Sequence, residues 1–494
     1  MKYDYIIFTP FHMSRLIGAY KVAKILRDQG YNVKVIDFLH SLLQRNTMPL
    51  LLWLDEHIHQ NTVFCFSGTF MDFAIVNDAS KGDLGHGIST LGRRKKEVDP
   101  SDIFVRKILS NFVEDLKTDF PDNKIIVGGV GFNSQFLYDR LPIDHLFLGY
   151  GEDVAKNELV DIFKGKEVPA IIDSSPFDLK YDFHNSGNTF HESDIIFPHE
   201  VLPLEISRGC RFACKFCSFS LIGRKVSDKY IRHKDKIFDE LMHNYELFGT
   251  SNYNIVCDTF NETNEKLLVI KEVFDEFNKI TGEQIQFNSY IRLELANRFP
   301  EQISILRDMG VAAINLGIET LHYPSAKAVG KGIRTEDVYK TVSAMRKSWG
   351  PEARIHSGFI IGLPHETRET ATEWLTSLYN KELDLTSWKC SALRINPDKE
   401  TVFTSVFDRE ADKYGYKFET DPKKWKNEHW SYEECDEFVV EWTKKFIKSG
   451  VVKQADHPWG YLNFKNGIIK KRTDRDIVVA NEELVNGYID RLLQ

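Results

Sequence analysis

The chain has 494 residues, of which 42% are hydrophobic and 28% are charged, and its formal net charge is −8 at pH 7. A length about three times that of a typical domain predicts two or three domains with large buried cores, and it excludes a small disulfide-stapled fold. The globular composition argues against wholesale disorder, and the acidic balance supplies no overall attraction for nucleic acid.

The apolar segments are too short to cross a membrane. The longest apolar run, Met48 to Leu54, falls far short of the roughly 20 residues that a spanning helix needs. The first residues, MKYDYIIFTPF, enter a strand-like run and lack the apolar stretch and cleavage site of a signal peptide. Three of the seven cysteines lie between positions 210 and 217, which fits metal ligation in a reducing compartment. We therefore expect a cytoplasmic protein without membrane insertion.

Residues 1–152 alternate short apolar runs with helix-length stretches. A helix that begins after Ser14 is expected to end at Gly30, and a second helix is expected near residues 101–117. This alternation predicts a doubly wound, Rossmann-like parallel sheet, which binds ligands at the carboxyl ends of its strands. Five runs have the composition of its strands: residues 5–8, 33–38, 62–68, 124–129 and 145–152.

Three further segments follow along the chain. Residues 153–200 are mixed and polar and are interpreted as a linker. Residues 201–404 repeat the alternation and predict a partial (βα)6 barrel, with its active site at the carboxyl ends of the strands. Residues 405–494 are rich in Lys, Glu and Trp, and a mainly helical accessory segment is expected there. The six strand candidates of the barrel are residues 204–207, 253–258, 286–292, 312–319, 354–362 and 386–394.

The strongest chemical motif is SRGCRFACKFCSFS, residues 207–220. Its cysteines, Cys210, Cys214 and Cys217, have the spacing C-x3-C-x2-C. Three thiolates on one loop can hold three irons of a [4Fe–4S] cluster and leave the fourth iron without a protein ligand. Zinc is the alternative, but a structural zinc site usually has four protein ligands, and the nearest further candidate, His233, is 16 residues beyond Cys217.

This loop resembles the cluster motif of the radical S-adenosylmethionine (SAM) superfamily, including an aromatic residue, Phe216, before the last cysteine. The resemblance covers approximately residues 200–400. It implies that the open iron binds SAM and that the reduced cluster cleaves SAM to a 5′-deoxyadenosyl radical. It also implies that Phe216 packs near the adenine, and that a flavodoxin or ferredoxin serves as the reducing partner.

Two charged residues on predicted strands fit this resemblance. CDTFNET, residues 257–263, is similar to an acidic strand end of the family, although Cys257 replaces its first acid. Asp258 is therefore implied to accept a hydrogen bond from the SAM ammonium, and the alternative is that it caps a helix. Arg292 follows the third predicted strand and is either a partner of the SAM carboxylate or an ordinary strand-end arginine.

Two later segments resemble further strand ends of the family. NLGIET, residues 315–320, makes Glu319 a candidate for contact with polar groups of SAM. HSGFIIGLPHET, residues 356–367, resembles the fifth strand, where the backbone from Ile360 to Gly362 is implied to contact adenine. The order and spacing of these motifs behind the cysteine loop make the resemblance specific.

The N-terminal module resembles the cobalamin-binding domain that is fused to one large radical SAM class. The cobalt-ligating loop D-x-H-x-x-G of some cobalamin proteins is absent, because DLGHG, residues 83–87, has the wrong spacing. A Rossmann-like domain that no longer binds the cofactor is the alternative. Small residues at the predicted strand ends would let the nucleotide tail of cobalamin approach the backbone: Ser67, Gly68, Thr69, Gly128 and Gly129.

Together these resemblances imply a cobalamin-dependent radical SAM enzyme that methylates an unactivated carbon of a small-molecule or peptide substrate. Its cofactors would be a [4Fe–4S] cluster, SAM and cobalamin. A radical cyclisation or rearrangement is the rival reaction, and a non-catalytic cofactor-binding protein is the rival from another class. The basic stretches GRRKK, residues 92–96, and IKKRT, residues 469–473, are short, so no nucleic-acid partner is expected.

Overall fold

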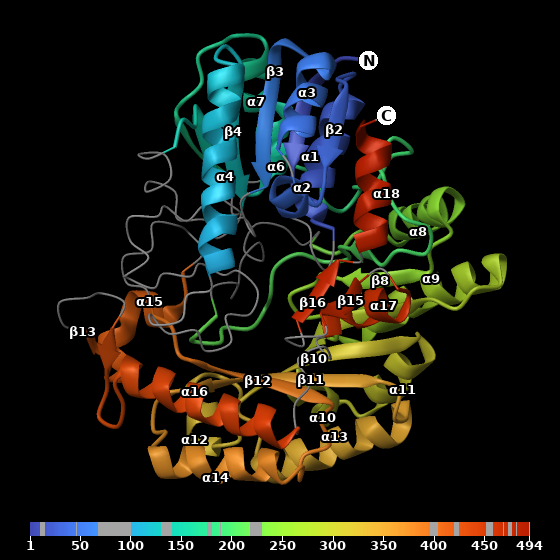
Figure 1. Ribbon diagram of the computed structural model, residues 1–494. Coiled ribbons are helices and arrows are strands. Elements are labelled where there is room, and N and C mark those ends of the chain that lie inside the picture. Colours follow the sequence, from blue (N-terminus) through green and yellow to red (C-terminus); the bar gives the residue numbers. More distant parts are fainter. Residues whose placement is uncertain are drawn as a thin grey trace.

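Two six-stranded parallel sheets organise the molecule, and Figure 1 shows the first sheet above the second. This computed structural model describes residues 1–9, 15–45, 47–67, 100–129, 141–174, 180–187, 189–217, 230–395, 404–418, 424–450, 458–467, 469–472, 477–480 and 482–493. Ser14, Gly68, Thr69 and the segments 83–87 and 92–96 of the sequence analysis lie outside these residues.

The first sheet has the strand order β2-β1-β3-β4-β5-β6, and all of its pairings are parallel. The predicted doubly wound fold is thereby confirmed. Its strands are β1 (Tyr3–Phe8), β2 (Val33–Ile36), β3 (Ile58–Ser67), β4 (Lys124–Gly129), β5 (His145–Gly149) and β6 (Ile171–Ser174). Its helices are α1 (Ile17–Asp28), α2 (Leu39–Arg45), α3 (Met48–His57), α4 (Pro100–Asp119), α6 (Gly151–Lys156) and α7 (Glu158–Phe163).

Alternate side chains of β1 enter two different cores, because successive residues of a strand point to opposite faces of the sheet. Tyr5 and Ile7 are buried in the core that includes residues of α1. Ile6 and Phe8 are buried with residues of α3 and α4. Helices on both faces therefore leave only the strand ends of this sheet for ligands, as in other doubly wound folds.

The first sheet extends beyond the predicted boundary at residue 152. The sequence indicates a linker over residues 153–200, whereas the structure places α7 and β6 there, and β6 pairs with β5. The strand β6 has the sequence IIDS, four residues, which is too short to show an alternating pattern. The predicted linker is therefore confined to the residues after Ser174.

The second sheet has the order β12-β11-β10-β9-β8-β7 and is also entirely parallel. Its strands match the six predicted ones within a few residues, which confirms a partial (βα)6 barrel. They are β7 (Leu202–Leu204), β8 (Asn252–Ile255), β9 (Gln286–Ile291), β10 (Val311–Glu319), β11 (Arg354–Ile361) and β12 (Ser387–Ala392). The intervening helices are α8 (Lys234–Phe248), α9 (Asn264–Thr281), α10 (Leu293–Arg298), α11 (Glu301–Asp308), α12 (Tyr323–Ala328), α13 (Thr335–Trp349) and α14 (Arg368–Tyr379).

The C-terminal segment is mainly helical, as predicted, and it contacts both sheets. Helix α16 packs against β12, helix α17 lies across β9, β10 and β11, and helix α18 returns to the first sheet beside α3 (Figure 1). No helix within the described part of the chain is both long enough and apolar enough to cross a membrane. The elements are α15 (Val406–Glu410), η3 (Ala411–Tyr414), β13 (Lys417–Phe418), β14 (Trp425–Lys426), α16 (Tyr432–Ser449), α17 (Pro458–Lys465), β15 (Ile469–Arg472), β16 (Ile477–Ala480) and α18 (Glu482–Leu493).

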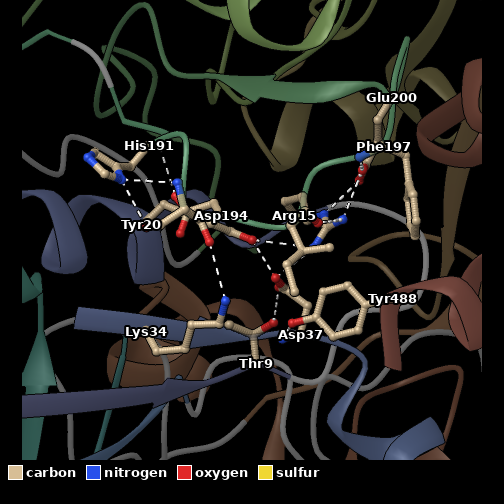
Figure 2. A network of polar contacts seen from close by, with 12 residues as sticks. Thr9, Arg15, Tyr20, Lys34, Asp37, His191, Asp194, Phe197, Glu200 and Tyr488 are labelled. Atoms are coloured by element: carbon tan, nitrogen blue, oxygen red, sulfur yellow. Dashed lines mark hydrogen bonds and ion pairs between the residues drawn. The ribbon is translucent and has the colours of Figure 1, made fainter. Parts of the chain in front are cut away.

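A buried arginine, Arg15, joins segments that are distant in the sequence. Figure 2 shows its guanidinium between the carboxylates of Asp37 and Glu200. It donates to Asp37 Oδ2 over 2.6 Å and to both oxygens of Glu200 over 2.7 and 2.9 Å. The hydroxyl of Tyr488 on α18 accepts the backbone N–H of Asp37 over 2.8 Å. The network therefore fastens α18 to the carboxyl end of β2.

Replacing Tyr488 by Phe should destabilise the first sheet, because the buried N–H of Asp37 would lose its acceptor. Such a loss costs about 1–3 kcal/mol. We expect a lower thermal unfolding midpoint and faster hydrogen exchange in a peptide that contains Asp37. The control is Asp490→Asn, an exposed position on the same helix. Exchange rates that are equal in the two variants would contradict this role of α18.

Candidate functional site

The cysteine loop begins directly after β7, at the carboxyl edge of the second sheet. Ser207 forms an antiparallel bridge with Ile231, and Arg208 N–H donates to Tyr230 O over 3.0 Å. Gly209 then has φ 75°, a left-handed conformation that favours glycine. These contacts turn the chain out of the strand and bring Cys210 to the edge of the sheet.

The three thiols occupy one compact loop. Cys210 and Cys214 are buried and Cys217 is half-buried, and Cys217 N–H donates to Cys214 O over 3.1 Å. Among the described residues, no group of three or more His, Cys, Asp or Glu residues converges as ligands of a single metal ion do. A cubane cluster does not require such convergence, since each cysteine binds a different iron. Three thiols on one loop therefore fit an iron–sulfur cluster better than a zinc ion.

Polar side chains that follow β8 and β9 contact two of these thiols. The Thr259 hydroxyl lies 3.3 Å from Cys210 Sγ, and Arg292 Nη1 donates to Cys214 Sγ over 3.0 Å. Burial raises the pKa of the Cys210 thiol, and the charge of Asp258 raises it further. Asp258 itself is exposed between two buried neighbours, Cys257 and Thr259. Its carboxylate therefore lies at the mouth of the barrel, beside the first cysteine.

The helix after β8 is capped by a residue other than Asp258. The side chain of Thr263 accepts the N–H of Lys266 over 3.1 Å at the N-terminus of α9. Thr263, not Asp258, is therefore the N-cap residue of α9.

Glu319 ends β10 in an unusual conformation. Its φ of 69° is left-handed, which is costly for a residue with a side chain and is often found at functional sites. Glu319 Oε1 lies 3.4 Å from Lys331 Nζ, and Lys331 also donates to Gly317 O over 2.9 Å. Burial raises the pKa of Glu319, and Lys331 opposes this shift. The carboxylate is thus held beside a cation at the strand end.

The predicted adenine contacts on β11 have different surroundings. Ile360 is half-buried, as is Phe216 on the cysteine loop. Gly362 instead donates its N–H to Glu366 Oε2 over 2.7 Å and accepts the Tyr416 hydroxyl at its carbonyl over 2.9 Å. A Cβ at Gly362 would lie 2.6 Å from the Trp425 ring. Gly362 is therefore packed against Tyr416 and Trp425 of the C-terminal segment.

Glu366 is a buried carboxyl to which the sequence analysis assigned no role, although it is part of the quoted PHET motif. It is completely buried, and burial raises its pKa to about 7. It also accepts Trp374 Nε1–H over 3.2 Å, while its carbonyl accepts Trp430 Nε1–H over 2.9 Å. These hydrogen bonds of Glu366 thus stabilise the turn after β11.

The small residues predicted to approach a ligand at the edge of the first sheet have different surroundings. Ser67 is half-buried at the end of β3 and pairs with Gly128. A Cβ at Gly128 would lie 2.2 Å from the ring of Phe147, so packing within the sheet already requires this glycine. Gly129 ends β4 with φ 144°. Packing against Phe147 is therefore sufficient to explain the glycine at position 128.

A contact between the two sheets was not anticipated from the sequence. Arg208, two residues before Cys210, donates to Glu152 Oε1 over 2.6 Å, and Glu152 lies in the first turn of α6, directly after β5. The Arg208 guanidinium also stacks on Tyr150, 4.2 Å from the ring centroid. The charge of Asp258 contributes to the raised pKa of Tyr150, after burial. The carboxyl edge of the first sheet therefore faces the cysteine loop.

One protein-family model matches the part of the chain that forms most of the second sheet. Residues 204–378 match the model of the radical SAM superfamily, and this stretch contains the cysteine loop and the strands β8 to β11. The match agrees with the motifs that the sequence analysis assigned to that family.

Two curated proteins show similarity along the chain. An "Uncharacterized methyltransferase" of Pyrococcus horikoshii is 27% identical over 290 residues, 53% of this chain and 58% of that protein. The anaerobic magnesium-protoporphyrin IX monomethyl ester cyclase of Cereibacter sphaeroides is 23% identical over 296 residues, 54% of this chain and 46% of that protein. The chain thus spans about half the length of the curated relatives it matches.

A solved structure shares the arrangement of both sheets. The radical SAM methyltransferase TsrM from Kitasatospora setae, with cobalamin and a [4Fe–4S] cluster bound, superposes with a TM-score of 0.56 at 14% identity. The superposition covers 85% of this chain and 81% of TsrM. At this identity the likeness establishes the fold.

The raised pKa of Glu366 predicts a pH-dependent stability. Between about pH 4.5 and pH 7 the folded protein binds a proton that the unfolded chain releases, so stability falls as the pH rises through this window. A shift from 4.5 to about 7 corresponds to about 3 kcal/mol. Glu366→Gln cannot ionise, so its unfolding midpoint relative to the parent should increase from about pH 5 to pH 8. Glu373→Gln, an exposed position on α14, serves as the control, and parallel pH profiles for parent and Glu366→Gln would contradict the prediction.

Proposed function

Because residues 204–378 form a radical SAM domain, we propose that this protein is a cobalamin-dependent radical SAM enzyme that methylates an unactivated carbon. The observation that carries the proposal is the contact between Glu152 and Arg208. It sets the ligand-binding edge of a doubly wound sheet against the loop with the three cysteines. A cofactor held at that edge would therefore face SAM held at the mouth of the barrel.

The residues of the second sheet supply the SAM site. Cys210, Cys214 and Cys217 would hold three irons, and the bound [4Fe–4S] cluster would supply the electron that splits SAM. The exposed carboxylate of Asp258 is suited to accept the ammonium of SAM. Glu319, fixed by Lys331, offers a second acceptor at the neighbouring strand end.

Apolar groups would complete the same pocket. Phe216 and Ile360 are half-buried side chains that offer apolar surface for the adenine. Enclosing the reactive centre in this way excludes water from a radical reaction. The protein would thus act by positioning and shielding its reactants.

Cobalamin at the first sheet is supported by two kinds of observation. TsrM, whose structure contains cobalamin, shares the fold of both sheets, and the Pyrococcus relative is named a methyltransferase. Ser67 and Gly129 lie at the carboxyl ends of β3 and β4, the edge at which a doubly wound sheet binds its ligands. Radical cyclisation is the second candidate function, because another relative is named a ring-forming cyclase.

Replacing all three cysteines by alanine tests the radical SAM assignment. The anaerobic variant should lose its iron, its sulfide and its brown absorbance, and reduced protein should no longer convert SAM to 5′-deoxyadenosine. The matched control is Cys65→Ala, which removes a buried thiol of β3 and leaves the loop intact. Retention of near-stoichiometric iron and sulfide in the triple variant would refute the assignment.

Cobalamin binding is tested at the edge of the first sheet. Purified with excess hydroxocobalamin, the protein should carry close to one cobalt, and Ser67→Leu should lose most of it while its iron content stays unchanged. Asn61→Leu, exposed near the opposite end of β3, should retain cobalt. A parent protein without cobalt under reducing, anaerobic conditions would exclude the cobalamin part of the proposal. The appearance of methylcobalamin and S-adenosylhomocysteine would support methyl transfer over cyclisation.

A further inference from the structure

Arg292 brings a buried guanidinium to the cysteine loop. It follows β9 directly and is 9% exposed. Its Nη1 donates to Cys214 Sγ over 3.0 Å, and its Nη2 donates to Gly330 O over 2.7 Å and lies 3.2 Å from Glu294 Oε1. The guanidinium also stacks on Phe212, 4.1 Å from the ring centroid. The guanidinium is therefore held over the face of this ring and by hydrogen bonds from both of its terminal nitrogens.

These contacts point away from the two roles that the sequence left open for Arg292. A bidentate partner of the SAM carboxylate needs two parallel N–H donors on one edge of the guanidinium. Here Nη1 and Nη2 each donate to an acceptor of the protein, so a SAM carboxylate would have to share these nitrogens. An ordinary strand-end arginine would extend into solvent, whereas this one is buried. The acceptor of Nη1 is the sulfur of a cysteine that we assign to the cluster, which indicates a role in tuning that cluster.

We propose that Arg292 raises the reduction potential of the [4Fe–4S] cluster through its hydrogen bond to Cys214. This inference rests on the proposed function, since it requires a cluster on the three cysteines. On reduction, a one-electron donor adds one electron to the cluster, whose core passes from the 2+ to the 1+ state, and no bond forms or breaks. The ligand sulfurs then carry more negative charge, so an N–H donor aimed at one of them stabilises the reduced state.

The surroundings of Arg292 make the effect local. Glu294 neutralises much of its charge at long range, and Lys331, the neighbouring cation, is likewise paired with Glu319. Arg292 therefore affects the cluster mainly through its directed N–H···S contact. Because Arg292 and Cys214 are both buried, water screens this contact little.

The test is a redox titration of the full-length, reconstituted protein without SAM. The potential is adjusted with dithionite, and the reduced cluster is measured by electron paramagnetic resonance. Arg292→Gln should lower the equilibrium constant for reduction about tenfold, a shift of about 59 mV to more negative potential. Arg211→Gln removes an exposed charge from the same loop, and its potential should match that of the parent.

The outcomes separate this inference from the proposed function. A parent protein that holds no iron or sulfide contradicts the proposed function itself. An unchanged potential in Arg292→Gln, with weaker SAM binding, would overturn the tuning role and make Arg292 a SAM partner. Should this variant lose its cluster, Arg292→Lys decides the question, because it keeps the positive charge but has a single ammonium in place of the two nitrogens that contact Cys214 Sγ and Gly330 O. A more negative potential in Arg292→Lys would support the inference, and an unchanged one would overturn it.

Discussion

The ion pair between Arg208 and Glu152 is the interaction on which the arrangement of the two sheets depends. Arg208 is also bound by Glu205, which in turn pairs with Lys21 on α1. All four side chains are largely buried, and removing one partner from a buried pair typically costs about 3–5 kcal/mol because it leaves an uncompensated charge. The network therefore resists any sliding of one sheet past the other. Since Arg208 lies two residues before Cys210, the same contact also fixes where the cysteine loop begins.

Buried charge has a different function in each part of this protein. Arg15 with Asp37 and Glu200 joins segments of the chain, whereas Arg292 brings a positive charge to the sulfur of Cys214. Glu366, in contrast, is held by the N–H donors of Gly362 and Trp374. Burial raises the pKa of this carboxyl to about 7. The chain thus uses paired charges for alignment and an acid of raised pKa in the turn after β11.

Much of the fold could be predicted because strands and helices alternate with clear periodicity. The cysteine loop could be predicted because the spacing of three thiols restricts the chemistry that they can perform. The Arg208–Glu152 pair could not, since its partners are 56 residues apart and the cysteine motif that contains Arg208 does not indicate which carboxylate it contacts. Gly128 shows a further limit. The sequence predicted that a ligand could approach the backbone at this residue, but the ring of Phe147 occupies the position that a Cβ would take. The helical pattern of α18 likewise predicts a helix without revealing which sheet it covers.

The return of α18 to the first sheet has a consequence for protein synthesis. The N–H of Asp37 and the hydroxyl of Tyr488 that it contacts are 451 residues apart. At a translation rate of about 5–20 residues per second, the ribosome needs roughly 20 to 90 seconds to make the chain between them. During this interval the first sheet is exposed along the surface that α18 later covers. The core around its earliest strands is therefore complete only after α18 has been synthesised. A nascent chain in this state exposes apolar surface to which chaperones bind.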